Sequence, residues 1–149
     1  MPRDALRRGR TSLPHHAYHV TTCTHGRTAL FHDPANARLV IAQMRALHDE
    51  RLLESLAWVL MPDHLHWLFQ LSAGVELSFV IKRLKGRSAL ALVRRSGESG
   101  AVWQRGFHDH AIRGDEDFQA IARYIVANPL RAGLVRRVGE YPWWDAVWL

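Results

Sequence analysis

Two histidines separated by a single leucine are the first candidates for chemistry. His64 and His66 lie in the otherwise apolar stretch VLMPDHLHWLFQL, at 59–71. In a β-strand alternate side chains share a face, so both imidazoles would project from one face about 7 Å apart. Two imidazoles at that spacing can bind one divalent ion. The same pattern also occurs in strands that bind no metal, where the histidines are solvated or held by hydrogen bonds.

A divalent ion needs ligands beyond two imidazoles, so other donors in the sequence are relevant. Asp63 directly precedes His64, and the run HDHA contains His108, Asp109 and His110. Each of these side chains offers a nitrogen or oxygen donor. Both a place at a metal site and an ordinary surface role remain open for them.

Tyr124 and Asn128 are a second pair with chemical potential, in the segment DEDFQAIARYIVANPLRAGLV. Residues four apart lie on one face of an α-helix, one turn from each other. A tyrosine hydroxyl can act as a nucleophile, and an asparagine oxygen can bind a metal or accept a hydrogen bond. The plain alternative is a tyrosine on a packed helix with its hydroxyl in water, and an asparagine that ends the helix before Pro129.

The elements that must position these residues alternate along the chain. β-Forming runs predict strands at 16–24, 54–61, 64–71 and 107–113, and apolar periodicity predicts helices at 34–50, 76–95 and 115–128. Pro62 and Asp63 separate two apolar runs and predict a hairpin turn. The order β-α-β-β-α-β-α predicts an α+β, ferredoxin-like fold with an antiparallel sheet and both histidines on one of its strands. We expect the helices mainly on one face and the other face open for a site.

Single residues and apolar spacing predict further details of the helices and the tail. Asp33 and Pro34 predict the start of the first helix. Gly86 weakens the middle of the second helix. The aromatic tail YPWWDAVWL is expected to pack on the body of the protein. The predicted apolar faces consist of Leu39, Val40, Met44 and Leu47 in the first helix, and Phe79, Val80, Leu84, Leu90 and Val93 in the second.

Length and charge limit the class of protein. With 149 residues, 48% of them hydrophobic, the chain can form one domain with a substantial core. We expect a basic N-terminal arm at 1–13 and a single domain at 14–149. The net charge of +6 favours polyanionic partners, nucleic acid before an acidic membrane surface.

The single cysteine and the lack of long apolar runs indicate the cellular compartment in which the protein is expected. Cys23 alone excludes a disulfide framework and argues against a cysteine-based zinc site. No run approaches the roughly 18 apolar residues of a membrane span. The first ten residues are basic but lack the apolar core of a signal peptide. We therefore expect a cytoplasmic protein without a membrane partner.

Three motifs together resemble a known family. MPDHLH, VWQRGF and YIVANPLRAGLV occur here in an order and at distances similar to those of the REP-associated tyrosine transposases. These belong to the HUH single-tyrosine transposases, in which HUH denotes histidine, a hydrophobic residue and histidine, here His64-Leu65-His66. The resemblance extends from about Tyr18 to Trp144. The HUH element alone is a weak signal, and its combination with the other two motifs is a strong one.

This resemblance implies the same fold, with the HUH motif on a central strand, and a role for each part of the site. His64, His66 and Asn128 are implied to bind a divalent metal, Mg²⁺ or Mn²⁺, and Tyr124 on the C-terminal helix is implied to be the nucleophile. The implied activity is metal-dependent nicking, strand transfer and rejoining of single-stranded DNA in hairpin-containing REP-like repeats, through a covalent 5′-phosphotyrosine. A monomer rather than a homodimer is implied, in a bacterial cytoplasm and on the nucleoid when bound to DNA.

Basic residues suited to phosphate binding lie in the arm, in the second helix and around the proposed site. By resemblance, the arm is the expected reader of a short sequence beside the hairpin. Any one of these cations is as readily part of a solvated helix face. Trp103 either stacks on a base or belongs to the core. The candidates for DNA binding are Arg7, Arg8, Arg10, Lys82, Arg83, Lys85, Arg87, Trp103, Arg105, Arg113 and Arg131.

Two other functions remain compatible with the sequence. The chain could be a non-catalytic, ferredoxin-like nucleic-acid-binding module in which the histidine pair is incidental. It could also be a metal-dependent hydrolase that uses the histidines without the tyrosine. A covalent protein–DNA adduct distinguishes the transposase-like enzyme from both.

Overall fold

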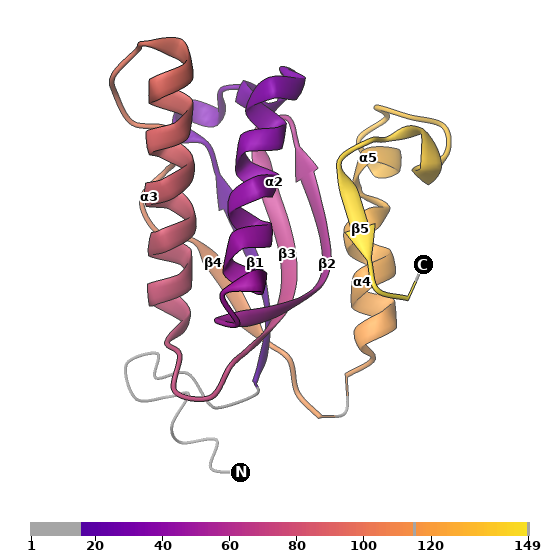
Figure 1. Ribbon diagram of the computed structural model, residues 1–149. Helices are drawn as coiled ribbons and strands as arrows, with labels where there is room; N and C mark the ends of the chain where they lie inside the picture. Colours follow the sequence, from indigo (N-terminus) through magenta and orange to yellow (C-terminus); the bar gives the residue numbers. More distant parts are fainter. Residues whose placement is uncertain (1–15, 115, 149) are drawn as a thin grey trace.

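The computed structural model describes residues 16–114 and 116–148, and Figure 1 shows its arrangement. The predicted arm at 1–13, with Arg7, Arg8 and Arg10, lies outside these residues. The helices and strands are β1 (Ala17–Cys23), α2 (Pro34–Asp49), β2 (Leu53–Met61), β3 (His64–Leu71), α3 (Leu77–Ser96), β4 (His108–Ala111), α4 (Phe118–Val126), α5 (Asn128–Arg131) and β5 (Trp144–Ala146). Short 3₁₀ helices are η1 (His25–Arg27), η2 (Leu30–His32) and η3 (Val138–Glu140).

The five strands form one sheet in the order β4-β1-β3-β2-β5, and all neighbours are antiparallel. The first four have the order expected of a ferredoxin-like fold, so the predicted fold class is confirmed. β3, which carries the histidine pair, is the central strand as predicted. The aromatic tail does more than pack on the body, because its residues Trp144–Ala146 pair with β2 as an additional edge strand.

The sheet has a different apolar cluster on each face. Leu65, Trp67 and Phe69 of β3 are buried with residues of α2 and α3, which lie side by side in front of the strands in Figure 1. Leu68 points to the opposite face and is buried with Ala122 and Ile125 of α4. Our expectation of an uncovered second face is therefore wrong where α4 packs over Leu68 and β2. The histidines lie on this second face.

The buried face of α3 differs from the prediction. Val80 and Leu84 are buried as expected, but Phe79 is 43% exposed and Leu90 is 51% exposed. Each helical residue turns by about 100°, so Phe79 points well away from its neighbour Val80. The Arg83 guanidinium lies 4.6 Å from the centre of the Phe79 ring and covers part of it. The other buried residues of this helix are Leu77, Ile81, Ser88 and Leu92.

The turn before the histidine pair is held in place by backbone hydrogen bonds. Pro62 and Asp63 connect β2 to β3, as the hairpin prediction required. The Pro62 carbonyl accepts from the Phe31 amide at 3.0 Å, and the Asp63 carbonyl accepts from the Thr24 amide at 2.9 Å. These bonds tie the turn to the segment after β1 and fix where β3 begins.

In the part of the chain that the structure describes, no helix is long and apolar enough to cross a membrane.

Candidate active site

His64 and His66 form a two-imidazole platform on the central strand. Their ring centres are 5.0 Å apart, and both side chains are half-buried. β1 runs beside them, with Thr21 opposite His66 and Cys23 opposite His64. A strand paired on both sides is rigid, so the two rings are held in a fixed relation, as the sequence predicted.

Asp63 orients the His64 ring. The Asp63 Oδ1 atom lies 2.7 Å from His64 Nδ1, and its Oδ2 atom accepts from Arg27 Nε at 2.9 Å. Burial opposes ionisation of this carboxyl, but the hydrogen bonds from His64 and Arg27 outweigh it and lower its pKa. A carboxylate only accepts hydrogen bonds, so His64 carries its proton on Nδ1 and its Nε2 lone pair remains for a ligand. Asp63, a candidate ligand in the sequence, therefore supports the histidine instead.

His66 is fixed by two side chains from β1. Its Nδ1 lies 3.0 Å from His19 Nε2 and 3.0 Å from Thr21 Oγ1. Burial lowers the pKa of His66 to about 3, with further lowering by the nearby His64, His19 and Arg131. The ring is therefore neutral at neutral pH and keeps a nitrogen lone pair. Sequence reasoning missed His19 and Thr21, because only the antiparallel register brings them next to a residue more than forty positions away.

This lowered pKa predicts a specific acid sensitivity. Above pH 6.5 His66 is unprotonated in both the folded and the unfolded chain and has no effect on stability. Between pH 6.5 and about 3 only the unfolded state binds the proton, so stability falls as pH falls. At pH 5 the loss is at most about 2 kcal/mol. Urea unfolding in EDTA at pH 7.5 and 5.0 measures it, and His66→Gln should lose less stability than the wild type. Equal losses in both proteins would contradict the prediction.

The helix that carries Tyr124 is shorter than predicted. It begins at Phe118 because the Asp117 carboxylate caps it, accepting from the Gln119 and Ala120 amides at 2.9 and 3.2 Å. It ends at Val126, and the four-residue α5 follows after Ala127. The predicted single helix at 115–128 is therefore wrong at the described residues 116 and 117, which precede α4, and at Ala127, where the helix is interrupted.

Asn128 and Pro129 explain the break between α4 and α5. In a continuous helix the residue at 129 would donate its amide hydrogen to the Ile125 carbonyl, and proline has none. The side chain of Asn128 replaces this bond, since its Nδ2 donates to the Ile125 carbonyl at 2.9 Å. The amide nitrogen is thereby engaged, and the Oδ1 atom is left for another contact.

This bond gives Asn128 a measurable structural role. Asn128→Ala and Asn128→Asp both remove the donor to Ile125, so each should lower the free energy of unfolding by about 1 kcal/mol. Thermal unfolding of the two variants measures the effect. Gln104→Ala, on an exposed side chain, is the control and should leave the midpoint unchanged. Unchanged midpoints in both Asn128 variants would show that the bond adds no stability.

Tyr124 and Arg131 are stacked at the junction of α4 and α5. Tyr124 is 56% exposed, and the Arg131 guanidinium carbon lies 4.0 Å from the centre of its ring. Arg131 Nη2 also donates to the Tyr124 carbonyl at 2.7 Å. The charge of Arg131 contributes to the low pKa of His66. The structure thus places Tyr124, Asn128 and Arg131 on the helix segment that packs over the histidine face of the sheet.

Several of the predicted DNA-binding residues are engaged within the fold. Lys85 Nζ donates to the Gln104 carbonyl at 2.9 Å and also to the Gly106 carbonyl. Arg87 makes a two-point contact with the Glu50 carboxylate. These contacts give both cations a structural role, and phosphate binding by them stays a prediction.

Trp103 belongs to the core. It is 8% exposed, its Nε1 donates to the buried Ser88 hydroxyl at 2.9 Å, and its ring lies 5.4 Å from that of Phe31. The option that Trp103 stacks on a base is therefore wrong for this conformation. Lys82, Arg83, Arg105 and Arg113 are exposed.

The site offers a divalent ion a small set of donors. Within residues 16–114 and 116–148, no group of three or more His, Cys, Asp or Glu side chains is arranged to hold a metal. His110, considered earlier as a ligand, contacts the Glu116 carboxylate at 2.9 Å. His108 and Asp109 lie on β4, with β1 between them and the histidine pair. The donors implied by the resemblance are His64, His66 and the Asn128 oxygen. This set fits Mg²⁺ or Mn²⁺, since such ions keep bound waters and take further oxygens from a substrate phosphate.

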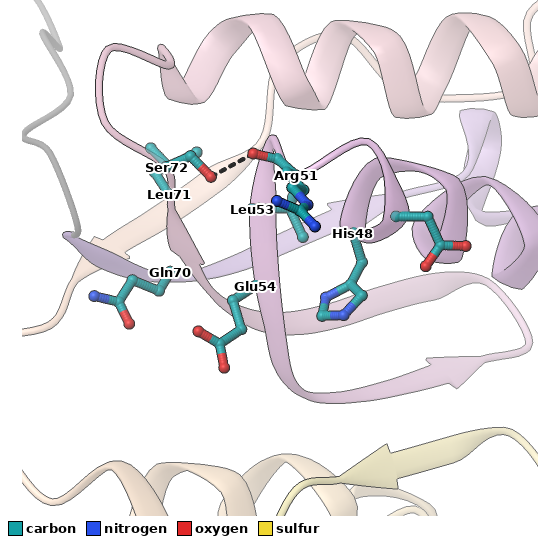
Figure 2. Close-up of a pocket in the computed structure, with 8 residues that line it drawn as sticks. His48, Arg51, Leu53, Glu54, Gln70, Leu71 and Ser72 are labelled. Atoms are coloured by element: carbon teal, nitrogen blue, oxygen red, sulfur yellow. Dashed lines mark hydrogen bonds between the residues drawn. The ribbon is translucent and has the colours of Figure 1, made fainter.

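A separate hollow lies at the other end of the β2–β3 hairpin. It has a volume of about 540 Å³, and Figure 2 shows His48, Glu54 and Gln70 around it. Glu54 pairs with Gln70, whereas His64 pairs with Met61 at the opposite end of the hairpin. Its lining includes two carboxylates, Asp49 and Glu54, against one guanidinium, Arg51, so this hollow is unfavourable for a phosphate backbone. It is not the site suggested by the histidines.

Known proteins resemble this chain in sequence and fold. The REP-associated tyrosine transposase of Escherichia coli (strain K12) is 31% identical over 94 residues, which cover 62% of this chain and 54% of that protein. The chain therefore spans about half the length of this relative. A solved structure described as a REP-associated tyrosine transposase bound to a REP hairpin superposes with a TM-score of 0.74 and 23% identity, covering 89% of this chain and 77% of that one. At this identity the likeness concerns the fold.

The family match covers the part of the chain that contains both halves of the site. Residues 12–128 match the family described as Transposase IS200 like. This range extends from before β1 to Asn128 and so includes the histidine pair, α3 and Tyr124. The chain belongs to the IS200-like transposase family.

Proposed function

We propose that this protein is a metal-dependent single-strand DNA nickase and strand-transferase that acts on hairpin-containing repeats through a covalent 5′-phosphotyrosine. The proposal rests on one observation: two features of the site lie on the same face of the sheet. One is the rigid His64–His66 platform, and the other is the broken helix that holds Tyr124, Asn128 and Arg131. A simple binding module needs neither a supported histidine pair nor an exposed tyrosine on the helix that packs over the same face of the sheet.

The chain's own residues would act on a phosphodiester as follows. Tyr124 Oη attacks phosphorus, its proton passes to solvent, and the new O–P bond forms as the bond from phosphorus to the 3′-oxygen breaks. The 3′-oxygen takes up a proton from solvent and leaves as the 3′-hydroxyl, and the 5′-phosphate stays on the tyrosine, so the reverse reaction can rejoin a strand without ATP. Arg131, stacked on the Tyr124 ring, is placed to hold the anionic phosphate near the attacking oxygen.

The metal would be held by His64, His66 and Asn128. When bound, it supplies charge neutralisation at a non-bridging phosphate oxygen. Asp63 with Arg27 and His19 with Thr21 each fix one imidazole, so both rings are oriented before any substrate arrives.

The role of Asp63 can be tested by metal affinity. Asp63→Ala should weaken Mn²⁺ binding by roughly 10–100-fold, because the His64 ring loses the partner that fixes its tautomer. Isothermal titration of Mn²⁺ measures this. Asp63→Asn keeps an acceptor oxygen and should restore most of the affinity. If both variants bind Mn²⁺ as the wild type does, Asp63 does not position His64.

The DNA substrate is proposed from the relatives. The Escherichia coli protein is described as REP-associated, and the solved structure is described as bound to a REP hairpin. The net charge of +6 supports a nucleic-acid partner for this chain as well. We also propose a monomer, since the sheet edges β4 and β5 are short and offer little backbone for pairing with a second copy.

The decisive experiment looks for the covalent intermediate. The full-length protein is incubated with Mn²⁺ and 5′- or 3′-labelled single strands that contain a hairpin from the DNA beside its own gene. The expected product is a protein–DNA adduct that survives a denaturing gel and maps to Tyr124 by mass spectrometry. Cleavage without an adduct would favour a hydrolase, and binding without cleavage would favour the non-catalytic module.

A further inference from the structure

A groove beside α3 has no role in the site described above. One wall consists of Lys82, Lys85, Gly86 and Ala89 of α3, and the other wall is the segment 100–107. Its volume is about 520 Å³, within the range of ordinary ligand pockets. Val102 and Phe107, both half-buried, contribute apolar surface to it, so it could receive a flat apolar group.

The charges around this α3 groove have a single sign. The described residues that line it include three cations, Lys82, Lys85 and Arg105, and no carboxylate. Lys85 is engaged with the carbonyls of Gln104 and Gly106 and thereby holds the second wall. Lys82 and Arg105 are exposed and have no ion-pair partner within the described part of the chain. Apolar walls with a cationic rim match a nucleotide, whose base is apolar on its faces and whose phosphate is anionic.

Gly86 is a second observation that points to a ligand. Glycine inside a helix costs about 1 kcal/mol relative to alanine, and Gly86 lies in the middle of α3. The fold does not require it there, because a Cβ at this position would have no heavy atom within 4 Å and the backbone is ordinary helix. A glycine exposed in a groove lets another molecule approach the helix backbone closely.

A smaller hollow shares residues with the α3 groove and with the support of His66. It has a volume of about 250 Å³, lies where β1 meets β4, and is lined by Thr21, Cys23 and the segment 104–108. Thr21 contacts His66, and the α3 groove shares residues 104–107 with this hollow. This hollow therefore offers a route past β1, from the histidine face of the sheet to the α3 groove on the other face.

From these observations we propose that the α3 groove binds an unpaired nucleotide of the DNA strand that leaves the histidine site, with its base between α3 and 100–107 and its phosphate at Lys82 and Arg105. This inference rests on the proposed action on single-stranded DNA. It adds that the enzyme grips the strand away from the scissile bond. Such a contact would give preference for a hairpin with a single-stranded extension over a bare hairpin.

The test compares bare and extended hairpins. Fluorescence anisotropy in EDTA, where no cleavage takes place, gives Kd for a DNA hairpin alone and for the same hairpin with a short oligothymidine extension on either side. Gly86→Trp fills the groove from α3, so it should remove the gain in affinity from one extension, about tenfold, and leave the bare hairpin unchanged. Gly86→Ala is the matched control and should bind both DNAs as the wild type does.

Two further variants keep the test valid if Gly86→Trp does not fold. Lys82→Ala and Arg105→Ala should each reduce the salt dependence of extended-hairpin binding by about 0.7 in log–log slope. Glu54→Trp, beside the hollow of Figure 2, should have no effect. Equal binding of extended hairpins by wild type and Gly86→Trp, or an equal loss with bare hairpins, would overturn the groove proposal. Adduct formation by the wild type is measured separately, at saturating DNA. Its absence would contradict the proposed function but would leave the proposal of nucleotide binding in the α3 groove untouched.

Discussion

Tyr124→Phe should form no covalent adduct with DNA and bind the same DNA with an affinity within about twofold of the wild type. The side chain is 56% exposed, so the loss of one hydroxyl should leave the fold intact. The aromatic ring remains under the Arg131 guanidinium, which keeps the junction of α4 and α5 in place. Only the attacking oxygen is removed. A denaturing gel with labelled hairpin DNA and Mn²⁺ measures the adduct, and anisotropy measures affinity.

Tyr141 provides a matched control for this experiment. Its hydroxyl is buried and donates to the Leu60 carbonyl at 2.6 Å, and burial raises its pKa to about 12. Tyr141→Phe should therefore lower stability by about 1 kcal/mol and still form the adduct. Full adduct formation by Tyr124→Phe would show that Tyr124 is not the nucleophile. Loss of the adduct in a folded Tyr141→Phe would show that the experiment does not single out Tyr124.

Local sequence patterns were sufficient for most of the fold. Alternation in HLHWLFQL predicted a strand with two different faces, and the turn Pro62-Asp63 predicted the hairpin that delivers it. These features depend on neighbours in the chain, so they can be read without the tertiary structure. The start of α2 is a further example, since Asp33 accepts from the Ala35 amide as an N-cap residue should.

Features that depend on distant partners were predicted less well. Phe79 and Leu90 are apolar but face solvent, and Trp103 lies in the core because Ser88 and Phe31 meet it there. The tail forms β5 only because β2 has a free edge. The break after Val126 depends on a side-chain bond from Asn128, which the sequence Asn-Pro suggested only as a helix stop.

In the candidate site, too, the sequence predicted some residues and could not predict those that depend on distant partners. The sequence supplied His64, His66, Tyr124 and Asn128, and the structure places them on one face of the sheet, with their catalytic and metal-binding roles still to be tested. It could not supply His19 and Thr21, since their contact with His66 follows from the pairing of β1 with β3. The contacts of His19 and Thr21 fix the orientation of the His66 ring. The proposed binding of metal by the histidine pair can be tested by substitution.

His64→Ala and His66→Ala should each weaken Mn²⁺ binding by at least about tenfold, and the double variant should bind none above background. Each substitution removes one of only two imidazole donors, and the Asn128 oxygen cannot hold the ion alone. Isothermal titration without DNA measures binding independently of cleavage. Adduct formation should fall in parallel, because the phosphate would lose the charge neutralisation that favours attack.

The two single variants should differ in their effect on the fold. His66→Ala leaves the half-buried His19 and Thr21 side chains without their shared partner, so it should cost about 1–3 kcal/mol of stability. His64→Ala leaves Asp63 paired with Arg27 near the surface and should cost less. His32→Ala, which truncates an exposed side chain at the end of η2, is the control for nonspecific loss of a histidine. Because His64→Ala should lose metal with little loss of stability, unchanged Mn²⁺ binding in that variant would refute the ligand assignment without any ambiguity from misfolding.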